Sequence, residues 1–311
     1  MRPPLPDRRQ MLALGALGAA GLARGPAALA GADKPAAPRG PRTTFQIGCM
    51  TLPWSAFPLQ RALEGVKAAG YKFVAWGTTH PEGGKKNVPV LAGDAPPEQA
   101  RERALRCRDL GLEPVMMFGP GPEQVDALKA RIRQAQAGGV AQVLVMGSTR
   151  GNDAGTWIKN FKELGPYARD HGVLVVVKQH GGNTGTGAAL AEIVGAAADP
   201  GVRISYDAGN VMDYHKIDPQ PDIRKCADLV HSFCIKDHRL FPRDEDCGPG
   251  LGEIDHYRLL APVAFTGRAM PLCCENIFAP VVPRPDRPEG IDALARRARE
   301  YLELVVAGLQ T

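Results

Sequence analysis

The sequence predicts a single (β/α)₈ barrel (a TIM barrel), an α/β fold in which parallel strands alternate with helices. Short apolar runs, typical of strands buried on both faces, alternate eight times with longer helical patterns. Glycines close several helical patterns just before a strand, at Gly70, Gly111, Gly138 and Gly172. Eight such units over about 265 residues match the length and rhythm of this barrel.

The first 32 residues have the features of a twin-arginine signal segment. Arg8 and Arg9 precede an apolar stretch that is too short to span a bilayer well, and small residues suited to cleavage follow at 28–32. An uncleaved N-terminal anchor is the alternative. We expect export to the periplasm or beyond, with no membrane span in the mature protein. Residues 33–44, rich in proline and polar residues, predict a linker, and residues 45–311 the barrel.

The expected strands are short and mostly apolar: Phe45–Met50, Phe73–Trp76, Pro114–Phe118, Gln142–Met146, Val173–Lys178, Arg203–Asp207, Ser232–Lys236 and Pro271–Glu275. The expected helices lie between and after them: Leu59–Ala69, Pro97–Leu110, Glu123–Ala137, Trp157–Asp170, Ala188–Ala197, Asp222–Leu229 and Gly290–Leu309. A doubly wound open sheet is the main alternative. The first strand is not followed by G-x-G-x-x-G, which disfavours that alternative.

Charge and cysteine content exclude some classes of protein. The formal net charge is +5, but outside residues 1–30 there remain 34 basic and 32 acidic residues. Such a near-neutral chain has no field of one sign to attract nucleic acid. Seven cysteines, an odd number with no zinc-site spacing, predict buried free thiols. Adjacent Cys273 and Cys274 should face opposite sides of their strand.

Charged residues stand at the ends of strands five to eight. Strand five ends in Lys178-Gln179-His180, with Lys178 and His180 on one face, and strand six ends at Asp207. Strand seven ends in Lys236-Asp237-His238 and strand eight at Glu275. In a barrel these ends meet at the face that carries the active site. An ion-pair network that merely closes the barrel end is the alternative.

These residue types suggest chemistry on a sugar. Asp207 and Glu275, with one or both of His180 and His238, could bind a divalent metal such as Mn²⁺, Co²⁺, Mg²⁺ or Zn²⁺. Lys178 and Lys236 could neutralise a developing enediolate, or act as bases if burial lowers a pKa. Glu275 is expected to be a metal ligand, the base, or each in turn.

Five further residues are expected to contact the substrate: Trp54, His80, Asn183, Asn210 and Asp237. Asn183 lies in a glycine-rich loop, residues 181–187, which could bind an anion or simply let the substrate approach. The acidic loop 244–250 has the glycines that a lid over the barrel mouth needs, and surface charge is its alternative explanation.

At these positions the chain resembles the sugar phosphate isomerase/epimerase superfamily, the xylose-isomerase-like TIM barrels, over residues 45–309. The segments that resemble it are VVVKQHGG (175–182), YDAGN (206–210), CIKDH (234–238), GPGLGEID (248–255) and LCCEN (272–276). The resemblance implies one divalent metal held by Glu, Asp, His and Glu from strands five to eight. Asp207 and Glu275 match this set, whereas Lys178 and Cys234 stand where the first Glu and the His are expected.

The resemblance implies an isomerase or epimerase that removes a proton next to a sugar carbonyl. We expect it to act, with metal assistance, on a non-phosphorylated sugar, which includes keto sugars. His180 and His238 would rebuild the metal site, or Lys178 would supply the positive charge in its place. Alternative functions are a lyase or hydrolase of 3-keto-glycosides, a sugar-binding barrel without catalysis and, least favoured, a metal-dependent endonuclease. A small carbohydrate is the expected partner, and a homo-oligomer is compatible with the sequence.

Overall fold

The computed structural model describes residues 40–311, and these form a closed barrel of eight parallel strands. The strands follow one another around the barrel as β1 (Thr44–Met50), β12 (Ala269–Cys274), β9 (Val230–Ile235), β8 (Val202–Tyr206), β7 (Leu174–Lys178), β6 (Gln142–Met146), β5 (Glu113–Phe118) and β2 (Phe73–Trp76). All eight expected strands are present, and the predicted fold class is confirmed. The expected signal segment and the first part of the expected linker lie outside the described residues.

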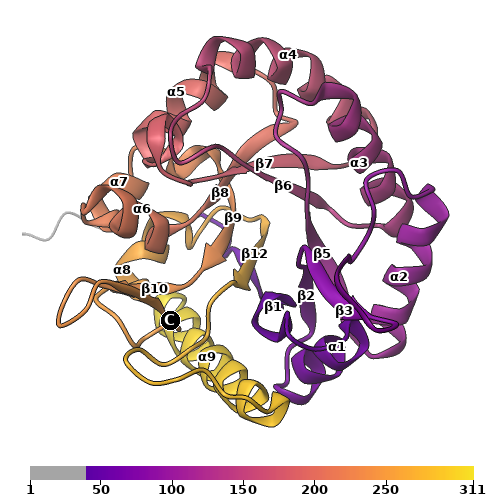
Figure 1. The fold of residues 1–311 in the computed structure, drawn as a ribbon. Coiled ribbons are helices and arrows are strands. Elements are labelled where there is room, and N and C mark those ends of the chain that lie inside the picture. The colour runs from indigo at the N-terminus through magenta and orange to yellow at the C-terminus, as the bar shows by residue number, and fades with distance from the viewer. Residues whose placement is uncertain (1–39) are drawn as a thin grey trace, which may run out of the picture. The chain divides into compact units, whose positions relative to one another are not determined.

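Helices surround the barrel (Figure 1). They are α1 (Leu59–Ala68), α2 (Pro97–Asp109), α3 (Val125–Gly138), α4 (Ala154–Asp170), α5 (Gly187–Ala197), α6 (Ala208–His215), α7 (Pro219–Ile223), α8 (His256–Leu260) and α9 (Pro288–Leu309). Four short 3₁₀ turns complete them: Leu52–Trp54, Gly182–Thr184, Ala227–Leu229 and Ala261–Val263. No helix of the described part is long and apolar enough to cross a membrane.

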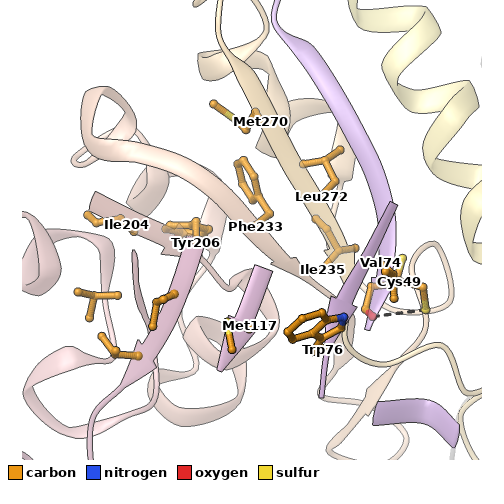
Figure 2. Close-up of a cluster of buried hydrophobic side chains, with 14 of the residues drawn as sticks. Cys49, Val74, Trp76, Met117, Ile204, Tyr206, Phe233, Ile235, Met270 and Leu272 are labelled. Atoms are coloured by element: carbon orange, nitrogen blue, oxygen red, sulfur yellow. Dashed lines mark hydrogen bonds between the residues drawn. The ribbon is translucent and has the colours of Figure 1, made fainter. Parts of the chain in front are cut away.

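Two layers of apolar side chains hold the barrel together. The larger layer packs the outward faces of the strands against the helices, and Figure 2 shows part of it, including Tyr206, Phe233 and Leu272. The smaller cluster fills the barrel interior and contains Val176 and Cys234 among others. Alternation along each strand therefore sends every second side chain inward, as a strand's period of two requires.

The cysteine prediction is confirmed. All seven cysteines are free and buried. Cys273 lies in the interior cluster next to Cys234, while Cys274 belongs to the outer layer and accepts a hydrogen bond from the Tyr71 hydroxyl at 3.5 Å. The two adjacent thiols thus face opposite sides of β12, as expected.

The segment after β8 differs from the sequence prediction. The single helix expected at Asp222–Leu229 is wrong, because the short α7 ends at Ile223 and a 3₁₀ turn follows at Ala227–Leu229. A helix that was not expected, α6, begins directly after Asp207. The Asp207 carboxylate accepts a hydrogen bond from the backbone N–H of Asn210 and so caps this helix.

Two antiparallel hairpins stand apart from the barrel sheet. One pairs β3 (Thr79–Glu82) with β4 (Lys85–Pro89), and the other pairs β10 (Asp237–Arg239) with β11 (Glu245–Cys247). Each follows the C-terminal end of a barrel strand, β2 and β9 respectively. Both hairpins therefore lie where a barrel forms its active site.

Candidate active site

Four charged side chains form one layer at the C-terminal end of the barrel. Lys178, Asp207, Lys236 and Glu275 come from β7 and from the first residues after β8, β9 and β12, which are neighbours in the sheet. Each stands two residues beyond an inward-facing residue, such as Val176 below Lys178 and Cys234 below Lys236. The period of a strand alone thus brings the four charges together.

The charges of this layer alternate in sign. The Lys178 Nζ lies 2.5 Å from Glu275 Oε1 and 3.1 Å from Asp207 Oδ2. The Lys236 Nζ lies 3.7 Å from Glu275 Oε2 and 4.0 Å from Asp207 Oδ2. The side chains of Lys178 and Asp207 are only 3% and 0% exposed. Charges buried this deeply persist only when they are paired, so each lysine stabilises the carboxylates beside it.

Hydrogen bonds fix the position of Asp207. Its backbone N–H donates to the side-chain oxygen of Gln179 at 2.8 Å, and its Oδ1 accepts from the Asn210 N–H at 2.9 Å. The Asn210 amide in turn donates to the Gln179 carbonyl at 2.6 Å. Only Oδ2 of Asp207 is left to face the two lysines.

Burial and pairing together set the protonation states. Burial opposes charge on Glu275, but Lys178 and Lys236 outweigh it and lower the pKa of Glu275 to about 2. Burial also opposes charge on Lys178, yet Glu275 and Asp207 hold its pKa well above the usual value, and the pKa of Lys236 is raised in the same way. The pKa of Asp207 is raised, mainly by burial. The raised pKa values favour the ammonium form of both lysines, so this geometry favours their role as positive charges over a role as bases.

A cavity of about 380 Å³ opens above this layer. Lys178, Lys236 and Glu275 line it, whereas Asp207 lies beneath. The remaining lining residues are Leu52, Pro53, Thr78, Phe118, Met146, His180, Asn210, Tyr214, Asp246, Asn276, Phe278 and Arg284. The volume suits a small ligand, and the charged groups meet it on one side.

The β10–β11 hairpin lines one side of the cavity with Asp246. The Asp246 Oδ2 accepts from the Lys236 ammonium at 2.8 Å. His238 is buried between two carboxylates, with Nδ1 2.9 Å from Asp246 and Nε2 2.8 Å from Asp244. Burial opposes protonation of His238, but these carboxylates outweigh it and raise its pKa. The acidic loop that the sequence suggested as a lid is thus tied to the charged layer through Asp246.

The four expected metal ligands do not come together as one group. The His180 Nδ1 lies 2.7 Å from the Gly147 carbonyl, and both ring nitrogens of His238 contact hairpin carboxylates. The Lys178 ammonium stands between Asp207 and Glu275, so a cation already fills the place between the two matching carboxylates. A divalent ion does not fit there, because two ammonium groups would repel it at close range.

Among the described residues, a different group could hold a metal ion: Asp213, His238 and Asp244, whose ligand atoms lie within 4.8 Å of one another. Only His238 was expected in such a role. Lys216 already pairs with this group, contacting Asp244 and lying 3.8 Å from Asp213. A divalent metal at His180, Asp207, His238 and Glu275 stays a prediction that this geometry does not favour.

The expected substrate contacts divide into one residue at the cavity and four outside its lining. Asn210 lines the cavity. The Trp54 indole donates to Asp292 at 2.9 Å, and the His80 ring contacts the Phe57 carbonyl and the Thr51 hydroxyl. The other two fix loops: Asn183 exchanges hydrogen bonds with the backbone of Asn152, and Asp237 accepts four backbone N–H groups.

Several cavity residues had no role in the sequence prediction: Phe118, Tyr214, Phe278 and Arg284. Tyr214 belongs to α6, which the sequence pattern did not reveal, and its ring packs edge-on against His180. Phe278 and Arg284 lie in the loop before α9, where the guanidinium of Arg284 stacks over the Phe278 ring at 4.3 Å. The one available signal was the position of Phe118 at the end of a strand.

Comparisons with known proteins relate this chain to a family. The sequence profile described as xylose isomerase-like TIM barrel matches residues 63–303. No curated protein matches the chain in sequence. Many solved structures match its fold, at sequence identities that show the fold alone.

Three of these solved structures illustrate the similarity. A xylose isomerase-like TIM barrel/4-hydroxyphenylpyruvate dioxygenase fusion protein is 19% identical, with a TM-score of 0.64; the match covers 85% of this chain but only 43% of the fusion. An L-ribulose 3-epimerase is 17% identical, with coverage of 85% and 95% and a TM-score of 0.63. A xylose isomerase-like TIM barrel protein from Mycobacterium smegmatis in complex with magnesium is 15% identical, with coverage of 86% and 98% and a TM-score of 0.66.

Proposed function

Because the chain belongs to the xylose isomerase-like TIM barrel family, we propose that it is a carbohydrate isomerase or epimerase-like enzyme that removes a proton next to a sugar carbonyl. The observation that carries this proposal is the contact of the Glu275 carboxylate with the Lys178 ammonium at 2.5 Å, at the floor of the cavity. The solved L-ribulose 3-epimerase of the same fold supports a sugar as the substrate.

Proton removal next to a carbonyl needs a base and a nearby positive charge. The base takes a proton from the carbon next to the carbonyl while the electron pair moves to the carbonyl oxygen and forms an enediolate. In an isomerisation the neighbouring hydroxyl proton then passes to that oxygen, and the base returns its proton to the former carbonyl carbon. Glu275 is the base in this proposal, since its carboxylate is ionised and lines the cavity. Lys178 and Lys236 hold the negative oxygen with ammonium groups that are already in place.

The proposed chemistry passes through no divalent metal. The family resemblance implies a metal ion beside Asp207 and Glu275 that would polarise the carbonyl. Here the Lys178 Nζ is within 3.1 Å of both carboxylates, so a fixed positive charge is already available to the substrate oxygens. Asp207 is fully buried, and its task is to keep Lys178 charged and in place.

The proposal also covers the chain outside the barrel. We propose that residues 1–32 are a twin-arginine signal segment and residues 33–44 a linker, so that the barrel of residues 45–311 is exported and acts on small carbohydrates outside the cytoplasm. The motivation is the Arg8-Arg9 pair before an apolar stretch. Fractionation of cells that express the full chain tests this: a barrel found only in the cytoplasm, with residues 1–32 intact, would disprove it.

The test of the reaction is exchange of a substrate hydrogen with solvent. Free aldoses, ketoses and 3-keto sugars are incubated with the enzyme in D₂O, and proton NMR follows loss of the C–H signal next to the carbonyl. We expect at least one sugar to exchange. The Glu275→Gln variant should lose about 10³-fold in rate, within the range for general bases.

A matched control uses a glutamate at the opposite end of the barrel. Glu113 begins β5 and pairs with Arg108 at 2.8 Å, so Glu113→Gln makes the same chemical change away from the cavity. It should leave the exchange rate unchanged. Exchange that survives in Glu275→Gln would disprove the assigned base. Sugar binding with no exchange for any sugar tested would disprove the enzyme and identify a binding protein.

A further inference from the structure

A second cavity adjoins the reaction cavity at the same end of the barrel. Its volume is about 410 Å³, and it shares Thr78 and Phe118 with the first cavity. The ends of β2 and β5, the β4 strand of the hairpin and the beginning of α3 form its walls. Each cavity alone lies in the size range of a small-ligand site. A free monosaccharide therefore leaves the second cavity without a function.

The second cavity contains a positively charged side chain, Arg131, that forms no ion pair among the described residues. Arg131 lines it, and the two terminal nitrogens of its guanidinium donate to the Leu91 carbonyl at 3.3 and 3.2 Å. Its Nε is buried without a hydrogen-bond partner, and no carboxylate among the described residues forms an ion pair with it. Burial accordingly lowers the pKa of Arg131 with no opposing effect from an acidic group. By contrast, Arg61, Arg108 and Arg239 each pair with a carboxylate.

The beginning of α3 adds to this positive potential. Gln124, Ala127 and Arg131 are spaced three and four residues apart, so they share one face of the helix, and all three line the cavity. Gln124 occupies the capping position, and no side chain caps the helix there. The positive end of the helix dipole therefore meets the cavity on the same side as the guanidinium. Asp126, in the same first turn, is not among the lining residues.

We propose that the second cavity binds an anionic group of the substrate, a carboxylate or a phosphate, carried on the part of the molecule remote from the reacting carbonyl. None of its lining residues is acidic, and the half-buried Arg131 guanidinium has no carboxylate partner among the described residues, so an anion that enters the cavity gains a charge-assisted contact. The substrate is then a two-part saccharide or glycoside with an acidic distal unit, held across Thr78 and Phe118. The orientation of the substrate in this inference rests on the proposed function. The binding of the anion does not depend on it.

The test compares three probes that differ in charge. Isothermal titration calorimetry measures binding of D-glucuronate, D-glucose 6-phosphate and neutral D-glucose to the full protein. We expect one or both anions to bind at least tenfold more tightly than glucose, and the preferred anion identifies carboxylate or phosphate. The Arg131→Gln variant should lose this preference, while glucose binding stays the same. Equal affinity for all three probes, or a preference that survives in Arg131→Gln, would overturn the inference.

Two control variants separate a lost site from a lost fold. Arg133 lies two residues further along α3 and donates to the Tyr167 hydroxyl at an exposed position, so Arg133→Gln should keep the anion preference. Arg131→Lys keeps the charge and should retain part of that preference even if Arg131→Gln folds poorly. In Glu275→Gln the anion preference should persist, because it depends on Arg131. An enzyme that fails to exchange any sugar but shows Arg131-dependent anion binding would refute the proposed function and support this inference.

Discussion

Lys178 decides the character of the charged layer. It stands where the family resemblance implies a glutamate, and its ammonium contacts both Asp207 and Glu275. A cation at this position makes the neighbouring carboxylates members of an ion-pair network. The same positive charge holds the pKa of Glu275 at about 2, so the proposed base is ionised at any pH near neutrality.

Replacement of Lys178 by methionine should destabilise the protein as well as inactivate it. The variant would leave Asp207 and Glu275 as neighbouring buried carboxylates with only Lys236 nearby. Removal of one partner from a buried ion pair costs about 3–5 kcal/mol. Urea denaturation measures the loss in the free energy of unfolding. The double variant Lys178→Met with Glu275→Gln should recover part of it, and equal stability of wild type and Lys178→Met would contradict the pairing.

The β10–β11 hairpin and the loop behind it depend on a single carboxylate. Asp237 Oδ1 accepts from the N–H groups of His238 and Ile254, and Oδ2 accepts from those of Gly250 and Gly252, at 2.8–3.0 Å. The sequence suggested that Asp237 contacts the substrate. In the structure it holds the turn that follows the acidic hairpin, and contact with the substrate stays a prediction.

The Asp237→Asn variant distinguishes these two roles. Asparagine keeps one acceptor oxygen but turns an NH₂ group toward two backbone donors, so the loop should open more often. We expect hydrogen exchange at the backbone amides of residues 248–254 to become at least tenfold faster, as measured by mass spectrometry. The KM for an exchanging sugar should change less than twofold. A large rise in KM with unchanged amide exchange would restore the substrate-contact role.

The sequence predicted the barrel strands well because their pattern depends on local composition. Every expected strand is present, and strand alternation correctly brought Lys178, Asp207, Lys236 and Glu275 to one end. It could not foresee α6, because residues 208–215 have few strong helix formers and the helix depends on its cap at Asp207. Nor could it separate His80 and Trp54 from the site, since their partners lie 23 to 238 residues away.

At the scale of the whole molecule, the two ends of the barrel differ. The charged layer lies at the C-terminal ends of the strands, and other ionisable groups lie at the N-terminal ends. His231, the second residue of β9, lies at the end opposite the charged layer, with its Nε2 3.1 Å from the Arg268 guanidinium. Burial, helped by Arg268 and Arg203, lowers the pKa of His231 to about 4. This neutral histidine makes the stability of the barrel depend on pH.

The sign of this dependence follows from the two states of His231. In the unfolded chain the pKa of His231 is near 6.5, so the unfolded chain binds a proton there as the pH falls through 6.5. The folded chain binds this proton only near pH 4, because the folded-state pKa is lower. Stability from this group is complete above pH 6.5 and is lost between pH 6.5 and 4, by roughly 1 kcal/mol at pH 5 after allowance for solvent screening.

The comparison of His231→Gln with wild type checks this prediction. Urea unfolding is measured for both proteins at pH 7 and pH 5. The difference in free energy of unfolding between the two pH values should be smaller in the variant by the contribution of His231. Identical pH dependence in the two proteins would assign the acid sensitivity to other groups.

The reacting charges and the lining of the second cavity come from different parts of the sequence. The reacting charges come from residues 178–275, while the lining of the second cavity comes from residues 76–131. In our two proposals, recognition of the distal unit and reaction at the carbonyl thus depend on separate stretches of the chain. Substitutions at residues that line only the second cavity, such as Gln124 and Ala127, are then expected to change which glycoside is accepted while the four reacting charges stay in place. For enzyme engineering, the residues that line only the second cavity are therefore the positions to vary when a different substrate is wanted.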